Sequence, residues 1–154
     1  MCGIFGFIGP DDLDSTSAKT LVKHAQQRGR DSSGMVIHDT TYHAYRADYP
    51  IGWLLKRIPP LGNLFFGHSR LVTNGTGDNQ PVSREQVIVL HNGIVVNHEA
   101  IWPILGKTPE LEIDTEIIPA IIASHLESGG SVETAAERVL SLAEGVVACA
   151  ALIP

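Results

Sequence analysis

The chain is poor in cysteine, in aromatic side chains and in long apolar segments. Only two of its 154 residues are cysteine, and the formal net charge is −6 with no run of Lys or Arg. A secreted disulfide scaffold carries more cysteines, so the low count indicates a reducing, cytosolic setting. The acidic balance and the scattered cations argue against nucleic acid or an anionic membrane surface as a partner.

The N-terminal segment lacks the pattern of an export signal. A signal peptide has a basic region followed by an apolar stretch and a cleavage site. Here the acidic residues Asp11, Asp12 and Asp14 follow the short apolar run 4–8. No apolar stretch approaches the roughly 20 residues that a membrane-spanning helix needs. The sequence therefore predicts a soluble, cytoplasmic protein.

Hydrophobic residues make up 44% of the chain, enough to build one core, and they fall into short segments. Apolar runs bounded by turn residues predict strands at 3–9, 64–68, 87–91 and 145–153, and a hairpin from 35–38 and 42–46. Capping residues predict helices at 16–28, from Asn97 or His98 to Leu105, from Asp114 or Thr115 to about Leu126, and from Ser131 to about Leu142. Residues 48–61 contain three prolines and predict an irregular loop around at most one helical turn.

Strands come first, helices follow, and a strand stands at each end of the chain. This order indicates an α/β or α+β layered sandwich, with no linker or repeat that would divide residues 1–154 into domains. The chain stops at Pro154, directly after the apolar segment 145–153. A buried strand as the last element would indicate that further chain or a partner covers it.

Cys2 is the first candidate for chemistry. Initiator methionine is usually trimmed before a small residue, and removal of Met1 would put a thiol and a free α-amino group on one residue. Such an amino group has a pKa of about 7.7–8.0 and can act as a general base toward the thiol. Taken alone, Cys2 is better explained as a buried structural cysteine. However, Gly3 and Gly6 weaken a strand unless its backbone must approach something closely.

Two further segments mix charges with glycine. Residues 28–34, RGRDSSG, follow the first predicted helix, and an ordinary helix C-terminus explains Arg28 and Gly29 but not the DSSG that follows. Residues 67–75, GHSRLVTNG, enter a glycine-rich loop. Arg70 is either a surface arginine at a strand end or a group that binds a substrate carboxylate with two hydrogen bonds.

Two shorter segments each have an ordinary explanation. The pair Asn92-Gly93 after His91 is typical of a hairpin turn. Alternatively, the Asn92 amide and the Gly93 N–H could form an oxyanion hole. The triplet 114–116, DTE, is best explained, when taken alone, as a helix cap with an acidic first turn.

Together these segments stand in a characteristic order, which is CGIFG from Cys2, RGxDSxG from Arg28, GHxRxxTxG from Gly67, QP at Gln80, HNGxxxN from His91 and DTE from Asp114. This order resembles the glutaminase domain of class II glutamine amidotransferases, which are N-terminal nucleophile hydrolases. The resemblance covers residues 2–126 and extends more loosely to 153. It implies one glutaminase domain over 1–154, with the layered αββα sandwich of that superfamily, cut short at its C-terminal end.

The resemblance also implies the roles of four residues in bond cleavage. Cys2 would form a γ-glutamyl thioester, with its own α-amino group as the base. Asn92 and Gly93 would form the oxyanion hole. Arg28 would support the surroundings of the nucleophile, and ammonia and glutamate would be the products.

Three residues would bind the substrate, L-glutamine. Arg70 resembles the residue that binds the α-carboxylate, Asp114 the residue that binds the α-amino group, and Thr73 lies in the same substrate loop. One cation and one anion suit a zwitterionic amino acid, because neither charge is then left unpaired.

The chain departs from the family pattern in places that distinguish its branches. Leu71 and Asn74 stand where sugar-phosphate amidotransferases carry Trp and His, and 80–82, QPV, is closer to the amidophosphoribosyltransferases. His91 before Asn-Gly argues against the asparagine synthetase branch. Arg30 stands where tyrosine or proline is more usual. These departures do not decide which branch of the family the chain resembles.

We expect no metal and no cofactor, since the seven histidines are scattered and no nucleotide-binding glycine loop is present. Family members continue into a synthase domain, and nothing in 1–154 could be one. We therefore expect a separate acceptor subunit, a stand-alone glutaminase or a fragment, in an oligomer or alone. Two alternatives keep the fold: a non-catalytic glutamine-binding or regulatory module, and an acylase or amidase.

Overall fold

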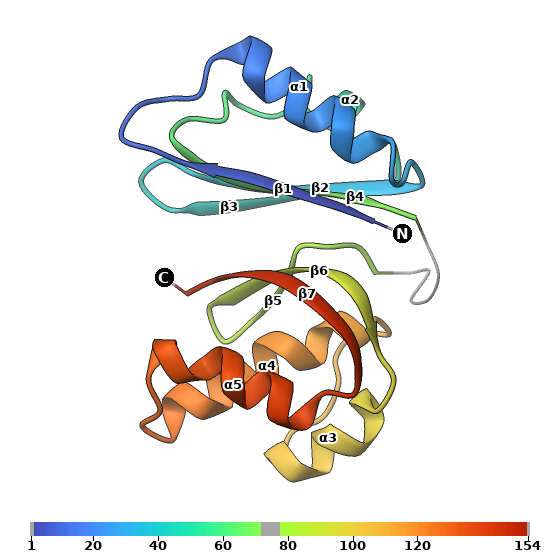
Figure 1. Ribbon diagram of the computed structural model, residues 1–154, viewed down its shortest axis with the longest axis vertical. Helices are drawn as coiled ribbons and strands as arrows, with labels where there is room; N and C mark the ends of the chain where they lie inside the picture. Colours follow the sequence, from blue (N-terminus) through green and yellow to red (C-terminus); the bar gives the residue numbers. More distant parts are fainter. Residues whose placement is uncertain (1, 72–77, 154) are drawn as a thin grey trace. The chain divides into compact units, whose positions relative to one another are not determined.

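The computed structural model describes residues 2–71 and 78–153. The chain forms two compact units, unit 1 with Met1–Thr73 and Asn79–Pro81, and unit 2 with Asn74–Asp78 and Val82–Pro154. In each unit, helices lie on one face of an antiparallel sheet (Figure 1). The predicted mixed α/β character is confirmed, while the αββα layering stays a prediction.

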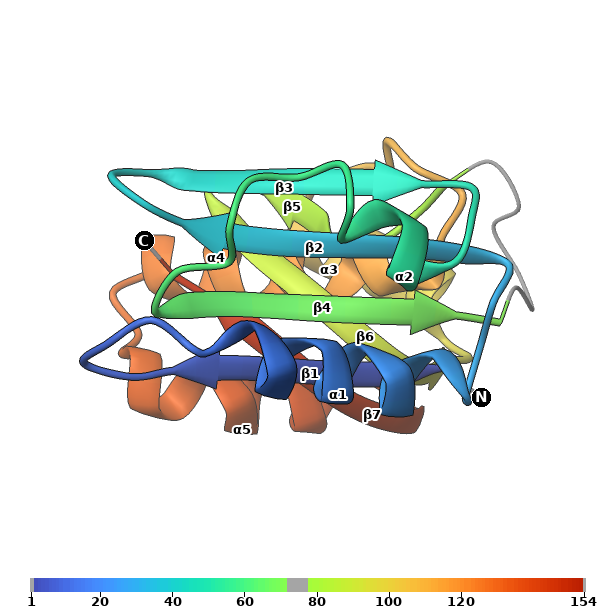
Figure 2. The same ribbon diagram turned by 90° about the horizontal axis from the view of Figure 1, so that it is seen from above.

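Unit 1 contains a four-stranded sheet in the order β1-β4-β2-β3. Its elements are β1 (Gly3–Ile8), α1 (Ser15–Gln26), β2 (Ser32–His38), β3 (Tyr42–Ala47), α2 (Ile51–Leu54) and β4 (Leu64–Arg70). Seen from above, α1 runs along β1 and α2 lies over β2 (Figure 2). The predicted hairpin is confirmed as β2–β3, and the single helical turn within 48–61 is α2.

The start and orientation of α1 follow from its sequence. The Asp14 carboxylate accepts the backbone N–H groups of Thr16 and Ser17, each at 3.0 Å, and so caps the helix. Ala18, Val22 and Ala25 are buried, and their spacing of three and four residues places them on one helix face. This face packs against the core of unit 1, which also contains Met35 and Phe65.

Unit 2 contains a three-stranded sheet in the order β5-β6-β7. Its elements are β5 (Val82–Arg84), β6 (Val87–Val95), α3 (His98–Leu105), the 3₁₀ turn η1 (Asp114–Glu116), α4 (Ile117–Glu127), α5 (Val132–Leu142) and β7 (Gly145–Leu152). Helix α4 is central, because 117–123 are all buried. Within the described ranges, no helix is long and apolar enough to cross a membrane.

Two of the ordinary explanations that the sequence offered are wrong in unit 2. Asn92 and Gly93 lie inside β6 and pair with Ala148 and Val147 of β7, so they form no hairpin turn. Asp114 makes no capping hydrogen bond at the start of a helix. Strand β7 is largely exposed along its length in the described chain.

Candidate active site

Cys2 lies directly before β1 and is half-buried. Arg28, just beyond α1, donates a hydrogen bond from Nε to the Cys2 carbonyl oxygen at 3.0 Å. The Cys2 Sγ lies 3.7 Å from the carbonyl oxygen of Leu71, which follows β4. The start of β1, the end of α1 and the end of β4 therefore meet around the thiol.

Two glycines allow this close approach of three backbone segments. A Cβ on Gly3 would lie 2.6 Å from the carbonyl oxygen of Ala25 in α1. A Cβ on Gly29 would lie 2.4 Å from the carbonyl carbon of Arg70. Real Cβ atoms do not approach backbone so closely, so both positions require glycine. The expectation that Gly3 marks a close approach is confirmed.

Arg70 ends β4 and is buried, with 3% of its surface exposed, so it is not a surface arginine. Its Nη1 lies 3.4 Å from Oδ1 of Asn79, and the Asn79 amide nitrogen donates to the Asp48 carboxylate. The backbone N–H of Asp31 donates to the Arg70 carbonyl oxygen at 3.0 Å. Asn79 and Asp48 were missed by the sequence analysis, because neither belongs to a motif.

The DSSG segment also has a packing role. Ser33 Oγ donates to the carbonyl oxygen of Tyr49 at 2.6 Å. A Cβ on Gly34 would lie 1.8 Å from the carbonyl oxygen of Gln80, so the Gln80-Pro81 segment packs directly on β2. Thr73, the third predicted substrate-binding residue, lies outside the described residues, as does Asn74.

In unit 2, Asn92 and Gly93 are fixed by β7 and by the adjacent His91. A Cβ on Gly93 would lie 1.8 Å from the carbonyl oxygen of Val146. His91 is buried, with Nε2 3.1 Å from that same oxygen and Nδ1 3.2 Å from Oγ1 of Thr115. Since a carbonyl only accepts, Nε2 carries the proton and Nδ1 accepts from the hydroxyl. Burial lowers the pKa of His91, which favours this neutral ring.

Asp114 is buried next to the same strand. Its Oδ2 accepts the backbone N–H of Val95 at 2.7 Å, two residues beyond Gly93. Its negative charge acts on His91, where it opposes part of the effect of burial on the pKa. Asp114 therefore stands near the end of β6 that carries Asn92 and Gly93, as a buried carboxylate held by one backbone donor.

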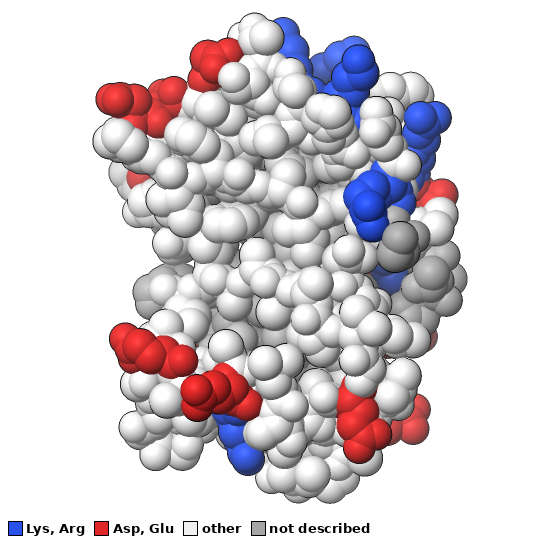
Figure 3. Space-filling model, in the orientation of Figure 1, with Lys and Arg blue, Asp and Glu red and all other residues white. Residues whose placement is uncertain are grey.

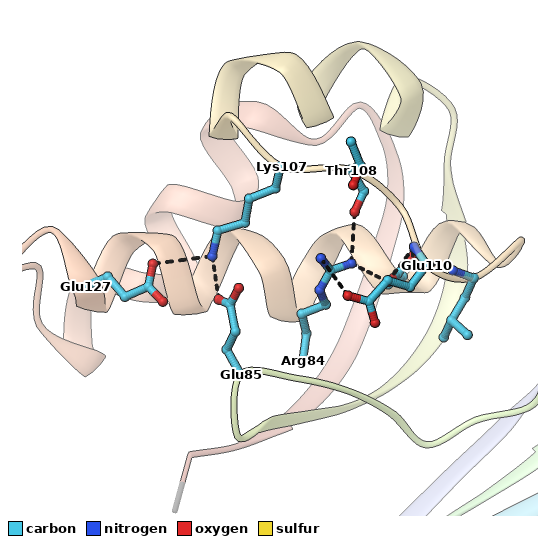
Figure 4. A network of polar contacts seen from close by, with 8 residues as sticks. Arg84, Glu85, Lys107, Thr108, Glu110 and Glu127 are labelled. Carbon is cyan, nitrogen blue, oxygen red and sulfur yellow. Dashed lines mark hydrogen bonds and ion pairs between the residues drawn. The ribbon is translucent and has the colours of Figure 1, made fainter.

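A polar network holds the segment before Asp114 (Figure 4). Glu116 is 1% exposed and accepts the backbone N–H groups of Glu110 and Leu111, each at 3.0 Å. Arg84 forms an ion pair with Glu116 at 2.5 Å and donates to the Thr108 carbonyl oxygen at 3.1 Å. The network thus fixes residues 108–111 and, through Glu116, the turn η1 that carries Asp114.

The sequence analysis missed this network, since it treated Glu116 as part of an acidic first turn. The sequence does contain a signal that Glu116 pairs with a cation. The segment 117–123 is apolar on all sides, which predicts a buried helix, and a carboxylate at the start of a buried helix needs a cation. The partner, Arg84, could not be chosen from sequence because it lies 32 residues away.

The predicted site residues fall into two groups. Cys2, Arg28 and Arg70 are brought together in unit 1, and Asn92, Gly93 and Asp114 in unit 2. In the part of the chain that the structure describes, no group of three or more His, Cys, Asp or Glu side chains could hold a metal ion.

Comparison with curated proteins finds extensive similarity. The chain is 35% identical over 145 residues to glutamine–fructose-6-phosphate aminotransferase [isomerizing] of Bartonella henselae, a match that covers 88% of the chain and 24% of the relative. It is 32% identical over 162 residues to the enzyme of the same name from Zymomonas mobilis, with 99% of the chain and 26% of the relative covered. The chain thus spans about a quarter of the length of these relatives. No family profile matches it.

A solved structure shows the same fold. The glutamine phosphoribosylpyrophosphate amidotransferase of B. subtilis, complexed with ADP and GMP, superposes with a TM-score of 0.75. The match has 24% sequence identity and covers 99% of the chain and 35% of that protein. The fold of nearly the whole chain is therefore that of one portion of a longer amidotransferase.

Proposed function

Because this chain belongs to the family of class II glutamine amidotransferase domains, we propose that it hydrolyses the side-chain amide of L-glutamine through Cys2. The observation that carries the proposal is the position of Cys2. The residue is half-buried before β1, and its backbone is held by Arg28 and by the close packing of Gly3 on α1. A nucleophile needs such a fixed position.

The reaction proceeds in two steps after Met1 is removed. The α-amino group of Cys2 accepts the thiol proton while Sγ attacks the amide carbon of glutamine. The tetrahedral intermediate collapses, the C–N bond breaks, and the same proton leaves with the nitrogen as ammonia. Water then attacks the γ-glutamyl thioester and gives up a proton through the amino group, which releases glutamate and restores the thiol.

Asn92 and Gly93 stabilise the negative charge on the oxygen of each intermediate. Their donors are the Asn92 side-chain amide and the Gly93 backbone N–H. Both residues lie within β6 and opposite β7, not in a loose turn. Donors on a rigid strand need no reorganisation as the charge develops, which is what an oxyanion hole requires.

Arg70 and Asp114 bind the two charges of the amino acid. The Arg70 guanidinium binds the α-carboxylate, and Asp114 binds the α-ammonium group. Both residues are buried, each with 3% of its surface exposed, so their charges interact strongly with a bound ligand. A cation for the carboxylate and an anion for the ammonium group select a free amino acid over the acyl substrates of an amidase.

Ammonia passes to an acceptor on another domain or subunit. The names of the two curated relatives state an amino transfer to fructose 6-phosphate, and the relatives are about four times as long as this chain. Leu71 and the QPV segment depart from the sugar-phosphate pattern, so the acceptor is proposed only as a class, an electrophilic metabolite that takes up ammonia.

Release of glutamate and ammonia from L-glutamine tests the proposal. We expect activity from the purified chain, none from Cys2→Ala, and full activity from Cys149→Ala, which removes the other, exposed cysteine. Asp114→Asn should raise KM for glutamine far more than it lowers kcat. Glutamine binding without turnover would instead indicate the non-catalytic alternative, and activity in Cys2→Ala would refute the role of Cys2.

A further inference from the structure

The positive charge of the chain is concentrated in unit 1. This unit carries eight of the 11 Lys and Arg residues and six of the 17 Asp and Glu residues, whereas unit 2 carries three and 11. The formal charges are therefore +2 and −8. In the space-filling view, blue side chains gather over one end of unit 1, the end that α1 and α2 occupy (Figure 3). The chain is acidic as a whole, but unit 1 has a net positive charge and a basic surface.

A hollow of about 560 Å³ lies between α1 and α2 on this surface. Four cationic side chains line it: Lys19 and Lys23 of α1, Arg30 of the following loop and Lys56 beyond α2. No Asp or Glu lines the hollow. We call this feature the α1–α2 groove.

The four cations differ from those of unit 2 in their partners. Among the described residues, none of the four takes part in a side-chain hydrogen bond or an ion pair. Arg84 and Lys107, by contrast, each contact two carboxylates. Lys19 and Lys23 are one helical turn apart, and like charges at this spacing destabilise a helix. Repulsion between these cations therefore raises the free energy of the folded chain, and a bound anion would lower it.

The floor of the groove is apolar and carries one oriented amide. Val22 is buried and Leu55 half-buried beneath the cations. The Gln26 side-chain oxygen accepts the backbone N–H of Gly52 at 3.2 Å, so the other end of the amide is an N–H donor. A Cβ on residue 52 would lie 2.8 Å from that oxygen, so a larger residue there would displace the Gln26 amide.

Helix electrostatics explains only part of this arrangement. Lys23 is in the last turn of α1, where a cation stabilises the negative end of the helix dipole. Lys19 is a turn earlier, and Lys56 belongs to a different segment. Arg30 lies beyond the last turn of α1, in the segment before β2.

We propose that the α1–α2 groove binds a small organic phosphate, a molecule with a phosphate group and an apolar body. The cations come from three segments and surround one hollow, which suits a compact anion better than an extended chain. The volume lies in the range of about 300–1,000 Å³ that small-molecule sites occupy. The apolar floor receives the body of the ligand, and the cations and the Gln26 amide receive its phosphate.

Calorimetric titration of the full chain tests this inference, with phenyl phosphate, inorganic phosphate and pyrophosphate as probes. We expect saturable binding of phenyl phosphate, tighter than that of inorganic phosphate because of the apolar floor. Lys23→Glu/Lys56→Glu should weaken it at least about tenfold, the effect of losing roughly 1.4 kcal/mol. Arg138→Glu, an exposed charge reversal on α5, should leave it unchanged, and Gly52→Ala should weaken it by displacing Gln26.

Each remaining outcome contradicts the proposal. Equal binding by the double variant, with a melting temperature like that of the unaltered chain, would show that the groove is not the site. An acidic decapeptide that binds where phenyl phosphate does not would indicate a protein partner instead. The binding assay uses no glutamine, so its failure would leave the proposed glutaminase activity standing.

Discussion

The Nε atom of Arg28 donates a hydrogen bond of 3.0 Å to the carbonyl oxygen of Cys2, so the end of α1 fixes the residue that precedes β1. The bond is made to the backbone of Cys2 and not to its sulfur. Arg28 therefore acts on the position of the nucleophile.

Arg28→Gln should slow the reaction of Cys2 with 6-diazo-5-oxo-L-norleucine. A displacement of a reacting group by about 1 Å can reduce a rate about 100-fold, so we expect a loss of about 10- to 100-fold. The bond is exposed to solvent, and the melting temperature should therefore change little. The rate of inactivation over a range of reagent concentrations measures the effect.

Arg30→Gln is the matched control, since Arg30 lies in the same loop and makes no contact with Cys2 among the described residues. It should react at the unaltered rate. Equal rates for both variants would contradict the assignment of Arg28 as a positioning residue.

Gly93→Ala should unfold or severely destabilise unit 2. The added Cβ would lie 1.8 Å from the carbonyl oxygen of Val146, so β6 and β7 could not keep their pairing. We expect a loss of at least about 3 kcal/mol in the free energy of unfolding, measured by urea denaturation. Inactivity of this variant would then say nothing about the oxyanion hole.

Gly106→Ala provides the comparison. Gly106 has a positive φ of 63°, but nothing lies within 4 Å of an added Cβ. Gly106→Ala should lower the free energy of unfolding by about 1 kcal/mol, from backbone strain alone. If both variants were equally stable, the strand pairing around Gly93 would be wrong.

Glu116→Gln should destabilise the chain and loosen the segment before Asp114. Arg84 keeps only 11% of its side chain exposed, and without Glu116 its buried charge loses its closest partner. Breaking a buried ion pair by removing one side typically costs about 3–5 kcal/mol. Chemical denaturation would measure the loss.

Glu127→Gln removes an exposed carboxylate from the Lys107 ion pair and should cost less than about 1 kcal/mol. Hydrogen exchange should show faster opening of residues 108–111 in Glu116→Gln only. Equal losses in the free energy of unfolding for the two variants would rule out a structural role for the Arg84–Glu116 pair.

The burial of His91 predicts a pH dependence of stability. Its pKa is lowered in the folded chain, so the unfolded chain takes up a proton first as the pH falls. The free energy of unfolding should therefore decrease below about pH 6.5, by at most about 1.4 kcal/mol per pH unit. His91→Gln should reduce this slope below pH 6.5 and leave the slope between pH 7.5 and 8.5 unchanged. An identical slope in both proteins would contradict a neutral buried ring.

Local patterns in the sequence predicted most elements of the fold. Asp14 and Ser131 cap α1 and α5 as expected, and the short apolar runs became strands. The hairpin-turn explanation of the Asn92-Gly93 pair was wrong because turn propensity is local, whereas β7 pairs with β6 from more than 50 residues away. Tertiary pairing overrides such a preference.

The candidate site was predictable only in part, for a related reason. Motif residues could be named because each carries a chemical group in a recognisable order. The contacts that hold them could not, since Arg70 depends on Asn79, and Asp114 on Val95, through distances set by the fold. The burial of Arg70 and of Asp114 also appears only in the structure.

Mass spectrometry of the chain after reaction with 6-diazo-5-oxo-L-norleucine identifies the nucleophile. We expect an N-terminal peptide that begins at Cys2, without Met1, and carries the single adduct on that residue. An adduct on Cys149, or an unmodified N-terminal peptide that retains Met1, would contradict it.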